Sequence, residues 1–150
     1  MFSAIFFFNN YMSFNKFSII LSRCYLFNTI IFLVGDFGIG KTFFSKGFLG
    51  NILDYNYNIS SSSFSKVNVF FLNDVCFYHS DFYDFISFED AYSKLSTCLD
   101  EKKKFLLVEW GEKLLQKIMP DLCVYIYVYT FSSRIIIIKS KHIDVLKLFL

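Results

Sequence analysis

The feature that most constrains this chain is an apolar run that leads directly into a glycine-rich loop and then into a segment of helical periodicity. The run NTIIFLVG, residues 28–35, is rich in β-branched residues and predicts a strand buried on both faces of a parallel sheet. After the loop, Phe44, Phe48 and Ile52 recur at helical spacing, so we expect a helix to open at Lys41. This order of elements is typical of a chain that binds phosphate at the start of the helix.

The loop fits the pattern G-x-x-x-x-G-K-[ST] of a phosphate-binding loop. Gly38 and Gly40 allow backbone N–H groups to converge on phosphate oxygens, and the first helical turn adds unpaired N–H groups. We expect Lys41 to meet the β- and γ-phosphates of a nucleotide, and the Thr42 hydroxyl to bind Mg²⁺. A glycine-rich turn that only joins a strand to a helix, without binding a ligand, would need neither Lys41 nor Thr42 at these positions. The candidate cofactor-binding positions in the loop are Gly35, Asp36, Phe37, Gly38, Ile39, Gly40, Lys41 and Thr42.

A site for a metal and a nucleotide also needs carboxylates, usually at the ends of buried strands. Glu109 ends the apolar run FLLVE, and Asp81 follows the strand-like segment VCFYHS. A hairpin that turns at residues 73–74 is expected to deliver Asp81 to the end of its strand. Asp81 and Glu109 are therefore the candidate catalytic residues. We assign Glu109 to the metal and Asp81 to water or metal, while the pattern leaves open which acid does which and whether either is an ordinary surface carboxylate.

The remaining segments complete an alternation of strands and helices. Residues 56–65, NYNISSSSFS, are polar and aperiodic and predict a loop that can move over a site. A weak helical pattern covers residues 88–99, a solvated charged turn covers residues 100–104, and a brief helix over residues 112–120 is closed by proline. Residues 122–140 predict two strands around a short turn.

This order predicts an α/β fold similar to P-loop NTPases, with a mostly parallel central sheet, hairpins and flanking helices. Residues 1–27 show no clean period and fit either a worn-down strand and helix or a poorly ordered arm. We therefore expect a degenerate or partly ordered N-terminal segment over residues 1–29 and a P-loop nucleotide-binding domain over residues 30–150, which the family resemblance given below makes a P-loop ATPase domain. A chain of 150 residues has room for one domain.

Composition excludes several other classes. The chain holds 22 Phe and 10 Tyr, a bias toward A/T-rich codons that inflates its apparent hydrophobicity. Its best membrane-span candidate, residues 17–34, is interrupted by polar residues, and the N-terminus lacks a secretory or transit pattern, so we expect a cytoplasmic protein without a membrane segment. Four scattered cysteines and two histidines predict neither a zinc site nor a disulfide framework. A net charge of +2 without a basic stripe argues against direct binding of nucleic acid, tRNA included once the family resemblance described next is considered.

Four segments together resemble the TsaE (YjeE) family. GDFGIGKT, SSSSFSKVN, HSDFYD and VEWGEKL occur in the order and at the separations of that family's GD-x-G-x-GKT, S-P-T-F/Y-x-x-V-N/E, H-x-D-x-Y-R and I/V-E-W-x-E motifs. The resemblance covers roughly residues 30–138. Departures are Ser62 for the usual Pro, Ser63 for Thr, Val69 for a polar residue, Asp84 for Arg and Gly111 for a frequent Pro.

The resemblance implies a small ATPase that uses ATP and Mg²⁺. It would work with TsaD-like and TsaB-like proteins in making N6-threonylcarbamoyladenosine in tRNA, and would reach tRNA only through them. It also places Ser63 among the cofactor-binding positions, on a mobile segment, and Trp110 and Glu112 in the last motif. From the pattern alone, a single tryptophan beside a strand, such as Trp110, more often packs in the core than serves as a platform for a base. By the same reasoning, His79 is expected to be a histidine at a strand end and not a ligand.

Two alternatives remain beside this one, a small-molecule kinase and an assembly factor, while a GTPase lacks its motif. A small-molecule kinase shares the loop but usually supplies several arginines to clamp its substrates, and this chain has only Arg23 and Arg134. A GTPase needs an N-K-x-D motif after the loop, whereas the only Asn-Lys pair, residues 15–16, precedes it. A nucleotide-binding assembly factor with poor hydrolysis would tolerate the departures at Asp84 and in the N-terminal segment.

Overall fold

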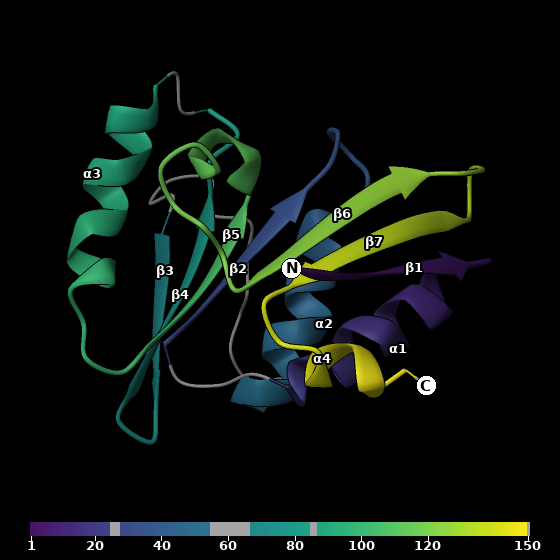
Figure 1. Cartoon of the computed structure of the whole chain (residues 1–150), viewed down its shortest axis with the longest axis horizontal. Helices are drawn as coiled ribbons and strands as arrows, with labels where there is room; N and C mark the ends of the chain where they lie inside the picture. Colours follow the sequence, from purple (N-terminus) through teal and green to yellow (C-terminus); the bar gives the residue numbers. More distant parts are fainter. Residues whose placement is uncertain (25–27, 55–66, 85–86, 150) are drawn as a thin grey trace.

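The computed structural model describes residues 1–24, 28–54, 67–84 and 87–149, and within them it has an α/β architecture built on one mixed sheet (Figure 1). The seven strands are ordered β1-β7-β6-β2-β5-β4-β3. The elements in chain order are β1 Phe2–Phe8, α1 Tyr11–Ser22, β2 Thr29–Val34, α2 Lys41–Leu53, β3 Val67–Leu72, β4 Val75–Asp81, α3 Phe88–Leu99, β5 Lys104–Glu109, η1 Gly111–Leu114, β6 Leu122–Val128, β7 Arg134–Ser140 and α4 Asp144–Lys147.

The centre of the sheet is parallel and its two ends are antiparallel. β2 pairs in parallel with β5 and with β6, and β5 pairs in parallel with β4. β3 joins β4 as an antiparallel hairpin, and β7 and β1 extend the other end by antiparallel pairing. The predicted fold class, a mostly parallel central sheet with hairpins and flanking helices, is therefore confirmed.

Strand register sets the position of the candidate site. Leu33 of β2 lies beside Glu109 of β5, and Glu109 lies beside Asp81 of β4. The arrows of β2, β5 and β6 point the same way in Figure 1, so the glycine-rich loop after β2 and both acids meet at one edge of the sheet. Ligands of open α/β sheets bind at this carboxyl edge.

Two apolar layers hold the helices against the sheet. On one face, α1 and α2 pack over the central strands through a cluster that includes Phe14, Phe44 and Phe48, all fully buried. On the other face, α3 and η1 cover β4, β5 and β2 through a second cluster that includes Phe32 and Leu95. α3 lies toward the β3 end of the sheet and α1 toward the β1 end (Figure 1).

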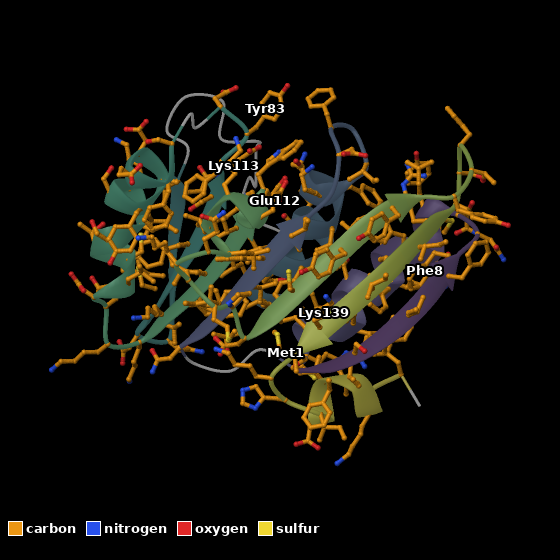
Figure 2. All side chains as sticks on the ribbon, turned by 45° about the horizontal axis from the view of Figure 1, so that its top comes forward. Met1, Phe8, Tyr83, Glu112, Lys113 and Lys139 are labelled. Atoms are coloured by element: carbon orange, nitrogen blue, oxygen red, sulfur yellow. The ribbon has the colours of Figure 1, made fainter. Side chains whose placement is uncertain are left out.

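The N-terminal residues form structure that periodicity did not reveal. β1 pairs with β7 over its whole length, and the side chains of Phe14 and Phe17 on α1 are buried in the main core. Met1 and Phe8 mark the two ends of this edge strand (Figure 2). Of the two alternatives for residues 1–27, the described part thus has the strand and helix. The division at residues 29 and 30 stays a prediction.

The expected elements over residues 88–99 and 122–140 are confirmed, as is the hairpin turn, where Asn73 and Asp74 both have positive φ. The expected helix over residues 112–120 is wrong, because only the single 3-10 turn η1 forms there. Leu114 is the only fully buried large side chain of that segment, so little apolar burial supports a longer helix. The loop expected over residues 56–65 lies outside the described residues.

Within the described ranges, no helix has both the length and the apolar character needed to cross a bilayer.

Candidate functional site

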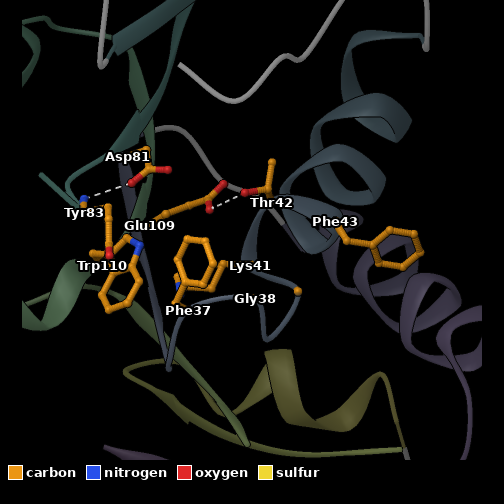
Figure 3. Close-up of a pocket in the computed structure, with 10 residues that line it drawn as sticks. Phe37, Gly38, Lys41, Thr42, Phe43, Asp81, Tyr83, Glu109 and Trp110 are labelled. Atoms are coloured by element: carbon orange, nitrogen blue, oxygen red, sulfur yellow. Dashed lines mark hydrogen bonds between the residues drawn. The ribbon is translucent and has the colours of Figure 1, made fainter. Parts of the chain in front are cut away.

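A cleft of about 240 Å³ opens at the carboxyl edge of β2, β4 and β5. The glycine-rich loop and the first turn of α2 form one wall, and the ends of β4 and β5 form the other (Figure 3). The residues that line it are Phe37, Gly38, Gly40, Lys41, Thr42, Phe43, Asp81, Tyr83, Glu109 and Trp110. The structure therefore brings both candidate acids and the candidate lysine and threonine together in one place.

The loop reaches α2 through a left-handed backbone. Gly40 precedes the helix with a φ of 113°, a conformation that glycine adopts without the strain a side chain would bring. Gly40, at the N-cap, has no side chain that could cap the first turn of α2, so among the described residues no N-cap side chain competes with a ligand for the N–H groups at the positive end of the helix dipole.

The eight loop positions do not all face the cleft. Phe37, Gly38, Gly40, Lys41 and Thr42 line it. Ile39 instead places its side chain in the main core, and Gly35 passes so close to the backbone of β6 that a Cβ there would lie 2.6 Å from a carbonyl oxygen. The carbonyl oxygen of Asp36 accepts a hydrogen bond from Lys41, and Asp36 is not among the residues that line the cleft.

Lys41 is almost fully buried and has contacts on three sides. Its Nζ donates to the carbonyls of Gly35 at 2.7 Å and Asp36 at 2.8 Å, and lies 3.6 Å from the centre of the Trp110 ring. Burial lowers the pKa of Lys41, and the nearby acids, Glu109 first among them, oppose that shift. A phosphate oxygen reaching the ammonium group would replace one of these contacts, the ring face being the weakest hydrogen-bond acceptor.

Glu109 lies at the inner end of the cleft and is 1% exposed. Its Oε2 accepts a hydrogen bond from the Thr42 hydroxyl at 2.9 Å, and its Oε1 accepts one from the Ser45 hydroxyl and pairs with His79 Nε2, both at 2.8 Å. Burial alone would raise the pKa of this carboxyl, but these partners, His79 most strongly, outweigh it and lower the pKa below its ordinary value. The carboxylate is therefore held in its charged form.

Asp81 lies beside Glu109 in the β-ladder but in different surroundings. It is partly exposed, and its Oδ1 accepts one hydrogen bond, from the backbone N–H of Tyr83 at 2.9 Å (Figure 3). Partial burial raises its pKa; the Tyr83 N–H opposes the shift and the neighbouring charge of Glu109 adds to it. This carboxyl is a better proton acceptor than an ordinary aspartate.

Sequence reasoning missed two partners of Glu109. Ser45 lies one turn beyond Lys41 on α2, so its spacing of four residues placed it on the same helix face. His79 lies two residues before Asp81, so both side chains point to one face of β4. The expectation of a strand-end histidine missed that its Nε2 pairs directly with Glu109, while its buried Nδ1 has no partner among the described residues.

Aromatic side chains form the outer part of the cleft. Trp110 packs against the second apolar cluster, in line with the expectation of core packing, and also lines the cleft, with its indole ring over Lys41 and 5.0 Å between its ring centre and that of Tyr83. Tyr83 in turn contacts Phe37 of the loop, with ring centres 5.5 Å apart. Lys113 of η1 contacts the turn that follows β4 at the mouth of the cleft, because its Nζ donates a hydrogen bond to the carbonyl of Tyr83 at 2.5 Å (Figure 2).

Gly111 and Asp84 are two of the positions at which this sequence departs from the family motifs. Gly111, which stands where the resembling family often has proline, lies against the Phe32 ring, and a Cβ there would be 2.4 Å from that side chain. Glycine is therefore the residue that fits. Asp84 is exposed and is not among the residues that line the cleft. Ser63, the remaining candidate position, lies outside the described residues.

The chain is similar in sequence to the members of one known family. The family model for the threonylcarbamoyl adenosine biosynthesis protein TsaE matches residues 9–136. The tRNA threonylcarbamoyladenosine biosynthesis protein TsaE of Rickettsia felis is 30% identical over 114 residues, which cover 76% of this chain and 66% of that protein. The protein of the same name in Haemophilus influenzae is 29% identical over 139 residues, 85% of this chain and 82% of the relative.

A solved structure agrees on the fold. The crystal structure of YdiB from Bacillus subtilis superimposes with a TM-score of 0.71 at 19% identity, covering 99% of this chain and 92% of YdiB. The family match extends over most of the chain and includes the loop, both acids and the segment between them. The chain belongs to the TsaE family of threonylcarbamoyl adenosine biosynthesis proteins.

Proposed function

We propose that this chain binds ATP with Mg²⁺ and hydrolyses it as the ATPase of tRNA threonylcarbamoyladenosine biosynthesis, acting with TsaD-like and TsaB-like partners. The observation that carries the proposal is the pairing of the Thr42 hydroxyl with the Glu109 carboxylate at 2.9 Å, beside Lys41 at the start of α2. A helix start, a lysine and a charged acid at one point supply the donors and the metal-binding oxygens that a nucleotide's phosphates require.

The loop would hold the phosphates by its backbone. Gly38, Gly40 and the first residues of α2 line the cleft, and their backbone N–H groups would donate to phosphate oxygens. Lys41 would exchange its contact with Trp110, or with a loop carbonyl, for an oxygen of the β- or γ-phosphate. Because the ammonium is already desolvated, little further dehydration opposes that exchange.

The oxygen donors in the cleft fit Mg²⁺. Thr42 and Glu109 would hold the ion, with Asp81 close by; among the described residues no cluster of three acidic, histidine or cysteine side chains could hold a metal by itself. Mg²⁺ commonly has few protein ligands and completes its shell with phosphates and waters. When bound, it would neutralise charge on the phosphates and polarise the γ-phosphate.

Asp81 would orient the attacking water. Its raised pKa and open position suit a group that accepts a hydrogen bond, and finally a proton, from water as that water's oxygen bonds to the γ-phosphorus. The bond from the γ-phosphorus to the bridging oxygen breaks, giving ADP and phosphate. Ser63, on the segment that the family resemblance calls mobile, would contact the γ-phosphate.

The lack of acceptor chemistry in the cleft supports a partner-directed ATPase over a kinase. Arg23 is exposed at the end of α1, and neither it nor Arg134 is among the residues that line the cleft. A kinase would need such cations around both of its substrates. We therefore propose that hydrolysis changes the state of the partner proteins, in the cytoplasm, and that tRNA is contacted through them.

The nucleotide assignment is tested by calorimetry with Mg²⁺-ATP on the full chain. Lys41→Ala is expected to remove measurable binding. Lys46→Ala, an exposed lysine on the same helix, is the matched control and should bind as the wild type does. Unchanged affinity in Lys41→Ala contradicts the assignment.

The role is tested by ATP consumption with and without a TsaD-like and TsaB-like pair. We expect slow hydrolysis by the isolated chain, faster hydrolysis with the pair, and loss of multiple-turnover tRNA modification in Lys41→Ala. A parallel screen of small phosphate acceptors separates the alternatives, because phosphorylation of an acceptor without any response to the pair would favour a kinase. Tight binding without hydrolysis under either condition would favour an assembly factor.

A further inference from the structure

Arg134 lies at the start of β7, is 4% exposed, and touches the glycine-rich loop from behind. Its Nε donates to the carbonyl of Ile39 at 2.9 Å, and its NH2 donates to the Tyr11 hydroxyl at 2.9 Å. The third nitrogen, NH1, donates to three carbonyls of the β6–β7 turn, those of Thr130, Phe131 and Ser133. A single side chain thus joins the loop, α1 and the β6–β7 turn.

This guanidinium is buried without an acid. The ion pairs among the described residues join His79 to Glu109, Lys141 to Asp121 and Lys147 to Asp144, and none includes Arg134. A buried charge that is held only by neutral oxygens is costly to the fold. Its place beside the loop indicates a role that a neutral residue of similar volume would not fill.

The contact with Ile39 fixes the orientation of one peptide group. In a planar trans peptide the C=O and the following N–H point in opposite directions. With the Ile39 oxygen held by Arg134 on the core side of the loop, the N–H of Gly40 is directed to the other side, and Gly40 lines the cleft. The charged donor also polarises this peptide and strengthens its N–H as a hydrogen-bond donor.

We infer that Arg134 is a positioning residue for phosphate binding: it turns the Ile39–Gly40 peptide so that the Gly40 N–H faces a phosphate of the nucleotide. The inference rests on the proposed nucleotide site and adds to it a residue that lies outside the cleft. Arg134 itself is not expected to contact phosphate, because it does not line the cleft and each of its three nitrogens donates to a protein oxygen.

The test uses the full chain, with Mg²⁺-ADP and pyrophosphate as probes in calorimetry. Arg134→Gln is expected to weaken both by about tenfold or more, since a hydrogen bond from a charged group is worth roughly that in an equilibrium constant. Tyr11→Phe is the matched control, because it removes a partner of the same guanidinium but leaves the bond to Ile39. Its affinities should stay within about twofold of the wild type.

A spectroscopic readout separates positioning from loss of fold. The chain has six glycines, so ¹⁵N-glycine labelling gives a spectrum in which the Gly40 amide can be assigned. We expect pyrophosphate to shift this amide strongly in the wild type, and Arg134→Gln to move its unliganded position and reduce the shift. Arg134→Lys, which retains the charge, should bind with intermediate affinity and keeps the test valid if the glutamine variant does not fold.

The outcomes are distinct. If the wild type binds the probes and Lys41→Ala does not, three results would overturn this inference and leave the proposed function standing. They are wild-type affinity in a folded Arg134→Gln variant, a loss of affinity in Tyr11→Phe equal to that in Arg134→Gln, and a Gly40 amide that does not respond to pyrophosphate in the wild type. If the wild type itself binds neither probe, the proposed function fails and this inference fails with it.

Discussion

Asp81 and Glu109, the two acids of the cleft, are neighbours in the β-ladder, yet their pKa values are shifted in opposite directions. Glu109, at the inner end, is surrounded by three side-chain partners, and its pKa is lowered. Asp81, at the mouth, has one backbone donor, and its pKa is raised. Burial acts in the same direction on both, so the number of directed donors decides the outcome. The surroundings of the inner acid favour its charged form, and those of the outer acid favour its protonated form.

The same contrast extends to their surroundings (Figure 3). The inner end takes its donors from α2 and β4, elements that are packed into the core. The mouth is formed by the aromatic residues Phe37, which is largely exposed, and Tyr83, which is about half exposed. We infer that the inner end is preorganised for phosphate and metal, whereas the mouth can rearrange around a ligand or a partner.

The largest expected effect is on hydrolysis when the inner acid loses its charge. Glu109→Gln should reduce the rate of ATP hydrolysis by about a hundredfold or more, because a neutral amide binds Mg²⁺ weakly. ATP binding through the loop should persist. A steady-state phosphate-release assay and calorimetry measure both, with the exposed Glu101→Gln as the matched control. A wild-type rate in Glu109→Gln would move the metal role to Asp81 and reverse the comparison.

The next effect concerns stability and pH. A carboxyl whose pKa is lowered in the folded state adds stability above its unfolded value, near 4.5 for Glu109, and this contribution is lost as the pH falls through the folded pKa. At pH 7, Glu109→Gln should therefore lower the free energy of unfolding by about 1–3 kcal/mol, and the deficit should shrink below pH 4.5. Urea unfolding across this range measures it.

Asp81 should show the opposite sign. Because its folded pKa is raised above 3.8, the folded state favours the protonated form, and the stability cost of the charged form grows as the pH rises above 3.8 and is complete above the folded pKa. Asp81→Asn should then be at least as stable as the wild type at pH 7, with the difference vanishing as the pH falls toward 3.8. Parallel pH curves for the two variants would contradict the comparison.

A smaller effect on turnover is expected at the mouth. Asp81→Asn should slow hydrolysis by about tenfold, since asparagine can still accept a hydrogen bond from water but cannot take its proton. Affinity for Mg²⁺-ATP should change little. The same phosphate-release assay applies, with the exposed Asp84→Asn as control. A loss as large as that of Glu109→Gln would show that both acids hold the metal.

The inner end and the mouth were also unequally predictable. The glycine pattern, the helix at Lys41 and the acids at two strand ends could be deduced locally, because spacing and periodicity report how an element is buried. The partners of Glu109 could not. Ser45 and His79 reach it only through the orientation of α2 and the register of β4 beside β5, and periodicity carries no information about which elements are neighbours.

The same limit explains the other differences. β1 is a strand because it pairs with β7, which follows it by more than a hundred residues, and its own sequence alternates poorly. Trp110 has a left-handed backbone, with a φ of 61°, and its ring lies over Lys41; a sequence pattern indicates neither feature. Arg134 looked like one of two isolated basic residues until the β6–β7 hairpin brought it behind the loop.

The smallest effect is expected at the tip of the loop. The Phe37 ring is 77% exposed, and its ring contact in the cleft is with Tyr83, so it shields little of the inner end. Phe37→Ala should leave the affinity for Mg²⁺-ATP within about twofold of the wild type, because binding depends on the loop backbone and Lys41. Calorimetry measures this, and Trp110 fluorescence, from the chain's single tryptophan, provides an independent titration. Tyr83→Ala is the informative contrast, since its ring also contacts Trp110, which covers Lys41. A tenfold loss in Phe37→Ala would place that ring against the nucleotide and make the mouth part of the preorganised site.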